Sequence, residues 1–247
     1  MSLSDDTREK IGPAPLLRDP MNALALAIVG LQILIAICAF PFLPDTVPIH
    51  WNIAGQADGF ASKWVNTLLF PLLSIGLYLL LRFVTGAGPR LGGRNSVAAN
   101  MQLRTVLLVA ILLFMLIVQL CVTAISLGMP VDITFVLNLA VSLLFIVIGN
   151  FMGKLRRNFW MGIRTPWTLA SEVSWERTHR IGGWLFVAVG LIGIPCSFVP
   201  ALRFWVIVPL IILVSVFLTG YSYVCYRQHA TEEGEPLSPP FDRANEE

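Results

Sequence analysis

Six long blocks of apolar residues constrain this chain more than any other feature. They cover residues 23–43, 65–81, 106–127, 131–148, 182–199 and 204–224. A helix needs about 20 residues to cross a hydrocarbon layer about 30 Å thick, and only the block at 65–81 is clearly short. Backbone groups inside a bilayer must hydrogen-bond within their own segment, so each block predicts a helix. We therefore expect an all-α, polytopic integral membrane protein with six transmembrane helices.

The positions of the basic residues predict the orientation. The chain has 17 Lys and Arg residues, and only 13% of all residues are charged. Lys and Arg accumulate in cytoplasmic connections. Six spans with both termini cytoplasmic place 15 of the 17 inside and leave only Lys63 and Arg203 outside. Omitting the short second span places 13 inside and four outside, so six spans fit better.

This topology divides the chain into four parts. Residues 1–22 form a cytoplasmic arm, and residues 226–247 form a cytoplasmic tail. The N-terminal three-helix half covers 23–127, with an extracytoplasmic loop at 44–64. The C-terminal three-helix half covers 128–225, with a cytoplasmic loop at 152–180.

The interiors of the spans exclude several classes of function. The core positions of the apolar blocks contain no Asp, Glu, Lys, Arg or His, and Asp132 lies at the edge of its block. Coupled transporters and intramembrane enzymes usually need an ionisable group at depth, so both are disfavoured. Gln32, Gln119 and Asn138 are expected to join helices by hydrogen bonds. No cysteine spacing indicates a metal or a disulfide, and we expect no cofactor.

Small residues near the end of the fourth block and within the fifth indicate close helix packing. The sequence contains Gly149-x-x-x-Gly153 and Gly190-x-x-Gly193. Glycines at such spacing let two helix backbones approach closely.

The outer loop carries the first set of candidate contacts. His50, Asn52, Gly55 and Asp58 lie within nine residues, and Asp58-Gly59 is typical of a turn. One interpretation makes these residues a contact for an extracytoplasmic ligand or toxin. The other is a compact loop held by internal hydrogen bonds, which we favour because the spacing matches no specific metal site.

The cytoplasmic loop has clear helix starts. Thr165-Pro166 suits an N-cap followed by proline, and Ser171-Glu172 suits a second start with acid in the first turn. A helix from Ser171 through His179 would place Glu172, Trp175, Glu176 and His179 on one face. Glu176 and His179 have the spacing of a metal-binding pair, but an intrahelical pair is favoured because no second copy exists.

Basic residues of this loop have two expected roles. Lys154, Arg156 and Arg157 follow the fourth span and are expected to meet anionic lipid. Arg164 instead lies between Trp160 and Trp167, and one interpretation of this position is stacking or a directed hydrogen bond to a partner.

The chain resembles the SdpI-type immunity protein family at these residues. The resemblance rests on Gly149, Asn150, Asn158, the run Gly162-Ile163-Arg164-Thr165-Pro166-Trp167-Thr168, Trp175, Thr178, His179, Arg180, Gly182 and Gly183. The outer loop resembles an uncharacterised N-terminal domain that often precedes this pattern, through Pro44, Pro48, His50, Asn52, Gly55, Asp58 and Gly59.

The resemblance implies a multi-pass protein of the bacterial inner membrane that protects its cell from a secreted peptide toxin. It also implies a receptor role, in which a small winged-helix repressor is held at the membrane. The candidate partner contacts are then Asn158, Gly162, Arg164, Thr165, Pro166, Trp167, Thr168, Trp175 and His179. No catalysis and no direct binding of nucleic acid are expected.

Two other classes of function stay open. A transporter or flippase-like protein for a hydrophobic or peptidic substrate would show a measurable flux. A membrane enzyme using His50 or the pair Glu176 and His179 would depend on those side chains alone.

Overall fold

The computed structural model describes residues 20–91 and 94–232, and its long helices confirm the six predicted spans. Each of the six is long and apolar enough to cross a membrane, and the second span, Lys63–Leu81, is the shortest at 19 residues. The helices are α1 (Pro20–Ala39), α2 (Lys63–Leu91), α3 (Arg94–Ser126), α4 (Ile133–Met152), α6 (Glu172–Ser197) and α7 (Pro200–Glu232). The chain is a mostly helical, multi-pass membrane protein.

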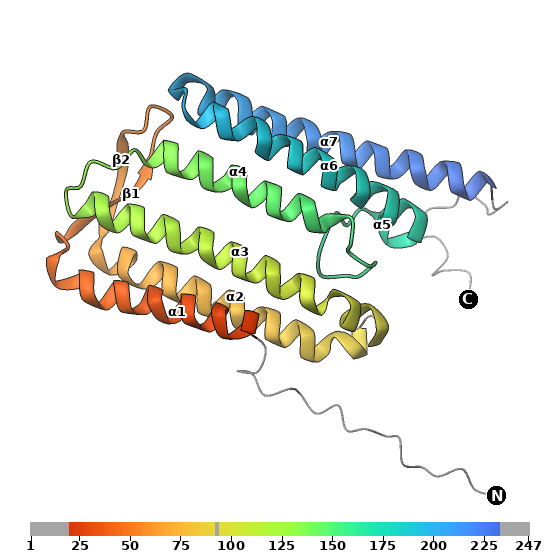
Figure 1. Ribbon diagram of the computed structural model, residues 1–247, viewed down its shortest axis with the longest axis horizontal. Coiled ribbons are helices and arrows are strands. Elements are labelled where there is room, and N and C mark those ends of the chain that lie inside the picture. The colour runs from red at the N-terminus through yellow and green to blue at the C-terminus, as the bar shows by residue number, and fades with distance from the viewer. Residues whose placement is uncertain (1–19, 92–93, 233–247) are drawn as a thin grey trace, which may run out of the picture.

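The helices form two groups (Figure 1). Helices α1, α2 and α3 pack on one another, and so do α4, α6 and α7, with α3 against α4 joining the groups. A two-stranded hairpin lies at one end of the bundle, and the short helix α5 (Pro166–Ala170) lies at the other. The two candidate regions are therefore at opposite ends of the spans.

The N-terminal group has an aliphatic core with polar groups inside it. Ala25 and Ile28 of α1 pack on Leu108 and Leu112 of α3, and all four are buried. Deeper along the same helices, Nε2 of Gln119 donates to the backbone oxygen of Gln32 at 2.9 Å. This contact confirms the prediction that buried amides join the helices.

The C-terminal group is packed much more closely. A Cβ atom added to Gly149 of α4 would lie 2.6 Å from the backbone oxygen of Gly183 in α6. A Cβ on Gly190 would meet the backbone oxygen of Ser142 at less than van der Waals distance. The backbones of α4 and α6 are thus in direct contact, which confirms the packing predicted from Gly149 and Gly190. Gly153 instead forms the C-cap of α4.

The outer loop folds as an antiparallel hairpin of β1 (Thr46–Trp51) and β2 (Ala57–Ser62). The turn between the strands covers Asn52–Gln56, and Gly55 within it has a φ of 78°. The turn predicted at Asp58-Gly59 is wrong, because both residues lie in β2. Gly59 pairs with His50, and a Cβ there would lie 2.8 Å from Cβ of His50, so glycine permits the strands to pair.

The limits of the second and third apolar blocks place Arg104 in the connection between them, but the structure places this residue within helix α3. Helix α3 begins ten residues earlier, at Arg94, and Arg104 is 3% exposed within it. The apolar block that begins at residue 106 indicated the span correctly. It did not indicate the start of the helix, which lies before the block.

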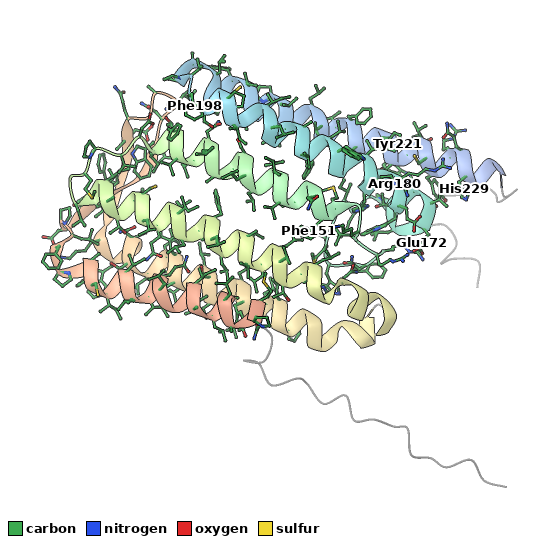
Figure 2. All side chains as sticks on the ribbon, in the orientation of Figure 1. Phe151, Glu172, Arg180, Phe198, Tyr221 and His229 are labelled. Atoms are coloured by element: carbon green, nitrogen blue, oxygen red, sulfur yellow. The ribbon has the colours of Figure 1, made fainter. Side chains whose placement is uncertain are left out.

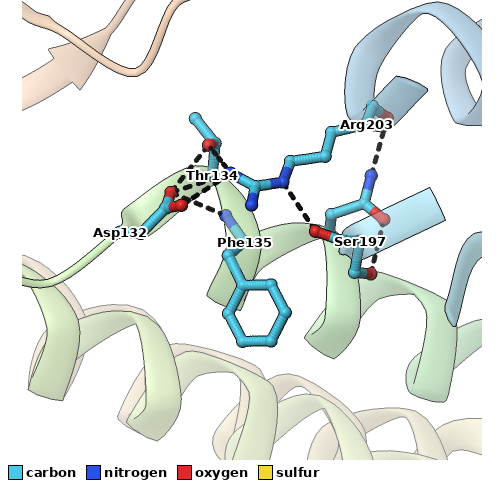
Figure 3. Close-up of polar contacts among 6 residues, drawn as sticks. Asp132, Thr134, Phe135, Ser197 and Arg203 are labelled. Carbon is cyan, nitrogen blue, oxygen red and sulfur yellow. Dashed lines mark hydrogen bonds and ion pairs between the residues drawn. The ribbon is translucent and has the colours of Figure 1, made fainter. Parts of the chain in front are cut away.

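A polar network fastens the hairpin end of the C-terminal group (Figure 3). Nη1 of Arg203 donates to Oδ2 of Asp132 at 2.7 Å and to the hydroxyl of Thr134 at 2.8 Å. Nε of Arg203 donates to the backbone oxygen of Ser197 at 2.7 Å, and Asn138 donates to the backbone oxygen of Arg203 at 2.6 Å. One arginine therefore joins the start of α4, the end of α6 and the start of α7.

Asp132 gives this network a pH dependence. Partial burial acts to raise the pKa of Asp132, but hydrogen bonds from the Phe135 amide, Arg203 and Thr134 outweigh it and hold that pKa below its ordinary value. A carboxyl group whose pKa is lowered by folding stabilises the protein above its unfolded pKa, and the contribution is lost as the pH falls towards the folded pKa. The contribution of Asp132 should disappear in the acidic range, below about pH 4.

We expect Asp132→Asn to flatten the decline in stability on acidification, by up to about 1 kcal/mol because the pair is partly exposed. The measurement is the thermal unfolding midpoint of the purified protein across this pH range. Asp45→Asn is the control, because that side chain is 94% exposed. An unchanged acid slope in Asp132→Asn would contradict the prediction.

Candidate functional site

The connection between α4 and α6, residues 153–171, forms the candidate site and is here named the signature loop. Figure 2 shows Phe151, Glu172 and Arg180 at this end of the bundle and Phe198 at the hairpin end. Helix α6 begins at Glu172, so the predicted helix through His179 exists and continues into the fifth span.

Two predicted caps shape the loop. The hydroxyl of Thr165 accepts from the amide of Thr168, and the hydroxyl of Thr168 accepts in return from the amide of Thr165. Pro166 occupies the first turn of α5, where its missing N–H is not needed. Ser171 caps α6 by accepting from the amide of Ser174. Both helix starts predicted from the sequence are confirmed.

His179 is the centre of the loop. Its Nε2 accepts from the amide of Ile163 at 2.9 Å, and its Nδ1 lies 2.8 Å from the backbone oxygen of Trp175. The amide can only donate, so Nε2 carries no proton and Nδ1–H donates to Trp175. Both ring nitrogens of this buried, neutral imidazole are thus used by the backbone, which argues against a catalytic or metal-binding role.

Gly162 allows the backbone to approach His179. Its φ is 101°, and a Cβ there would overlap Nε2 of His179 and lie 3.3 Å from the ring of Trp175. Only glycine combines this backbone conformation with the space available. The glycine of the Gly-Ile-Arg-Thr-Pro-Trp-Thr run is therefore a requirement of the loop's own fold.

Trp175 fixes the start of the loop. Its indole N–H donates to the backbone oxygen of Leu155 at 2.7 Å, and its ring stacks on His179 with centroids 4.0 Å apart. Trp175 is fully buried. Asn158 performs a similar task, because its side-chain oxygen accepts from the amides of Trp160 and Met161, both at 2.8 Å.

The two acids of α6 pair with arginines of the loop. Glu176 lies 3.8 Å from Arg156, and Glu172 lies 3.7 Å from Arg157. The predicted intrahelical pair of Glu176 and His179 is wrong. Glu176 faces Arg156, and both ring nitrogens of His179 are bonded to backbone groups. These two arginines, expected at anionic lipid, face carboxylates, although such exposed pairs contribute little stability.

The loop is also attached to α7, and the sequence did not reveal this contact. The hydroxyls of Thr165 and Ser222 lie 3.0 Å apart, and Ser174 donates to the backbone oxygen of Ser222 at 2.8 Å. Ser222 is fully buried. Its only signal in the sequence is a small polar residue near the end of the last apolar block.

A second missed contact joins the loop to the N-terminal group. Nδ2 of Asn100 in α3 donates to the backbone oxygen of Arg156 at 3.1 Å, and its Oδ1 accepts from the Arg156 amide at 3.0 Å. A single amide side chain thereby uses both backbone groups of one loop residue.

The predicted contact residues fall into two classes. Asn158, Thr165, Thr168, Trp175 and His179 are buried and hold the loop together. Gly162, Arg164 and Pro166 are exposed, and Trp167 is half-buried against Tyr223. Nη1 of Arg164 donates to the backbone oxygen of Phe159 at 2.7 Å. Direct contact with a partner would fall to this exposed class.

The outer candidates are held by contacts within the hairpin. Nδ1 of His50 lies 2.5 Å from Oδ1 of Asp58, and both side chains are exposed. Asn52 closes the turn, because its side-chain oxygen accepts from the backbone amide of Gln56 at 3.0 Å. Gly55 packs against Thr134 of α4. Within the described ranges no group of three potential metal ligands occurs. These contacts favour the compact loop that the sequence predicted.

The comparisons with known proteins give matches to both candidate regions, the signature loop and the outer hairpin. The SdpI/YfhL protein family model matches residues 154–223, and a domain of unknown function, DUF1648, matches residues 27–75. The immunity protein SdpI of Bacillus subtilis (strain 168) is 28% identical over 208 residues, which cover 84% of this chain and 96% of that protein. No solved structure matches.

The family match begins at Lys154 and includes the whole Gly162–His179 core and the α7 contact at Ser222. The DUF1648 match includes the turn of the hairpin and the start of α2. The resemblance seen in the sequence is thus confirmed: in this multi-pass bacterial membrane protein, residues 27–75 match DUF1648 and residues 154–223 match the SdpI/YfhL family.

Proposed function

We propose that this protein confers immunity against a secreted peptide toxin. The observation that carries the proposal is the similarity to an immunity protein along almost the entire length of that relative. It includes both the outer hairpin and the signature loop, so the two candidate regions are retained together. The proposal needs no catalytic step.

Protection can be tested directly in a toxin-sensitive bacterium that produces this chain. We expect these cells to survive a secreted peptide toxin that kills cells without the chain. Asp58→Asn tests whether the hairpin takes part in this protection. A variant that is present in the membrane but protects less would support contact at the hairpin. Equal killing of producing and non-producing cells by every toxin tried would reject the immunity function.

We infer further that the signature loop receives a cytoplasmic protein, for which a small repressor is the candidate. The loop is held on three sides by Asn100, Trp175 and Ser222, so its exposed face has a fixed shape. Arg164 projects from that face with one nitrogen anchored at Phe159. Arginine has five N–H donors, and the others can meet a partner.

Arg164→Lys should impair recruitment of such a partner and leave folding intact. Lysine keeps the charge but lacks the planar guanidinium group. It therefore cannot donate to the backbone oxygen of Phe159 and to a partner at the same time with the geometry of arginine. The measurement is membrane recruitment of a fluorescent repressor after toxin exposure. Arg180→Lys, an exposed arginine at the same end of the bundle (Figure 2), is the control. Normal recruitment in Arg164→Lys would reject the docking role.

A transporter or flippase-like function is the second candidate, and buried amides favour it. The side chains of Gln32, Gln119 and Asn66 are within the N-terminal group, and each has a polar atom with no hydrogen-bond partner among the described residues. Buried polar groups normally have partners. Flux of a labelled peptide into vesicles, abolished by Gln32→Leu, would support this function; equal flux in protein-free vesicles would reject it.

A further inference from the structure

Arg104 is a buried charge without a partner in the part of the chain that the structure describes. It is 3% exposed, and its Nε, Nη1 and Nη2 atoms make no hydrogen bond among the described residues. Burying an ionised group without a partner is costly, and breaking the pair of a buried ion is strongly destabilising. The guanidinium therefore points to a missing negative group.

The three described helices of the N-terminal half, α1, α2 and α3, contain no acidic residue. Between Asp58 and Asp132 the sequence has no Asp or Glu, and residues 20–44 have none. Asp45 and Asp58 lie at the hairpin, which is at the opposite end of the spans. Neutralisation of Arg104 must come from outside these helices.

The position of Arg104 indicates where the negative group would bind. The residue is the second in the span Leu103–Ser126, at the end of the bundle where the signature loop lies. Asn100, one helical turn or about 5.4 Å earlier on the same face, holds the backbone of Arg156. Leu108, one turn deeper, belongs to the apolar core.

The charged residues of the adjoining loop and of the preceding sequence are basic as well. Lys154 and Arg156 are in the adjoining loop, and Arg82, Arg90 and Arg94 precede Arg104 in the sequence. Arg156 has a carboxylate partner in Glu176, and Arg157 has one in Glu172. The two acids of α6 are thus paired with arginines of the loop, whereas the guanidinium of Arg104 has no partner among the described residues.

We propose that Arg104 is the centre of a phosphate-binding site, occupied by the headgroup of an anionic phospholipid at the junction of the two helix groups. A guanidinium matches the oxygens of a phosphate in a bidentate manner. Phospholipid phosphates lie at the depth where a span ends, and basic pockets between helices on this side of a membrane bind such headgroups. The bound phosphate would stabilise α3 beside the Asn100 contact and so support the signature loop.

The test uses the full-length protein in nanodiscs of phosphatidylcholine alone or with phosphatidylglycerol. Lipid bound to the protein is measured by native mass spectrometry, together with the thermal unfolding midpoint. We expect phosphatidylglycerol to be retained and to raise the midpoint. Arg104→Gln should lower the affinity for this lipid about tenfold, the value of one lost charge-assisted contact. Arg180→Gln, which removes an exposed charge at the same end, should keep it.

Two further arms make the outcome decisive. Arg104→Lys keeps the charge and is used if Arg104→Gln does not fold; it should retain the lipid more weakly than the wild type. Inorganic phosphate added to phosphatidylcholine nanodiscs tests whether the bound phosphate belongs to a lipid or to a free anion. A rise in the unfolding midpoint that depends on Arg104 would support the phosphate site and identify its occupant as a free anion.

The proposal fails if Arg104→Gln, or Arg104→Lys where the Gln variant does not fold, retains phosphatidylglycerol as the wild type does. It also fails if the N-terminal arm supplies the negative group. In that case neutralising Asp5, Asp6, Glu9 and Asp19 together would lower the midpoint in phosphatidylcholine, while phosphatidylglycerol would have no effect on the wild type.

Discussion

Gly149→Ala should separate α4 from α6 and greatly reduce the amount of folded protein. The new methyl group would lie 2.6 Å from the backbone oxygen of Gly183 and 2.8 Å from the amide nitrogen of Val187. Neither atom belongs to a flexible side chain, so one helix must move as a whole. Overpacking a core costs about 1–3 kcal/mol, and a clash with backbone should reach the upper end of this range.

The measurement is the unfolding midpoint and the monodisperse yield after extraction from the membrane. Gly76→Ala is the matched control, because a Cβ atom at Gly76 in α2 would meet nothing within 4 Å. That change should be neutral or slightly stabilising, since alanine favours a helix over glycine by about 1 kcal/mol. Equal behaviour of the two variants would show that α4 and α6 are not in backbone contact.

Gly162→Ala should disorder the signature loop while leaving the six spans folded. The methyl group would overlap Nε2 of His179, and alanine at a φ of 101° is itself strained, by about 1–3 kcal/mol. Moving the backbone away would break the hydrogen bond from Ile163 to His179. We expect loss of partner recruitment and of the slow hydrogen exchange of the Ile163 amide.

Hydrogen exchange of the peptide that covers residues 153–171 measures this effect. Gly153→Ala is the control in the same loop, because its φ is −67° and its Cβ would lie 3.6 Å from Cα of Arg180, an ordinary contact. Unchanged exchange of the loop in Gly162→Ala would mean that His179 does not hold Ile163.

The membrane architecture could be predicted because the lengths of apolar blocks translate directly into spans. The starts of α5 and α6 were also readable, since Thr165-Pro166 and Ser171-Glu172 carry the chemistry of helix caps. These are local effects, in which the residues that decide the structure are neighbours in the chain.

Features that depend on distant residues could not be predicted in this way. The hairpin register depends on the pairing of Gly59 with His50, which only a residue without a side chain permits. Because of this pairing the turn lies at Asn52–Gln56 and not at Asp58-Gly59. Trp175 and His179 resemble surface contacts in the sequence, but Gly162 lets the loop fold over them. The roles of Asn100 and Ser222 arise only when α3 and α7 meet the loop.

The backbone contact between α4 and α6 limits the kinds of motion that can connect the two faces of the membrane. Helices that interlock through Gly149, Gly183 and Gly190 cannot translate past one another without a clash. The pair ends at Asp132 and Ser197 on the hairpin side and at the signature loop on the other side. A disturbance at the hairpin, where Gly55 touches Thr134, can therefore reach the loop as a tilt of the whole pair, but not as a piston-like shift of one helix.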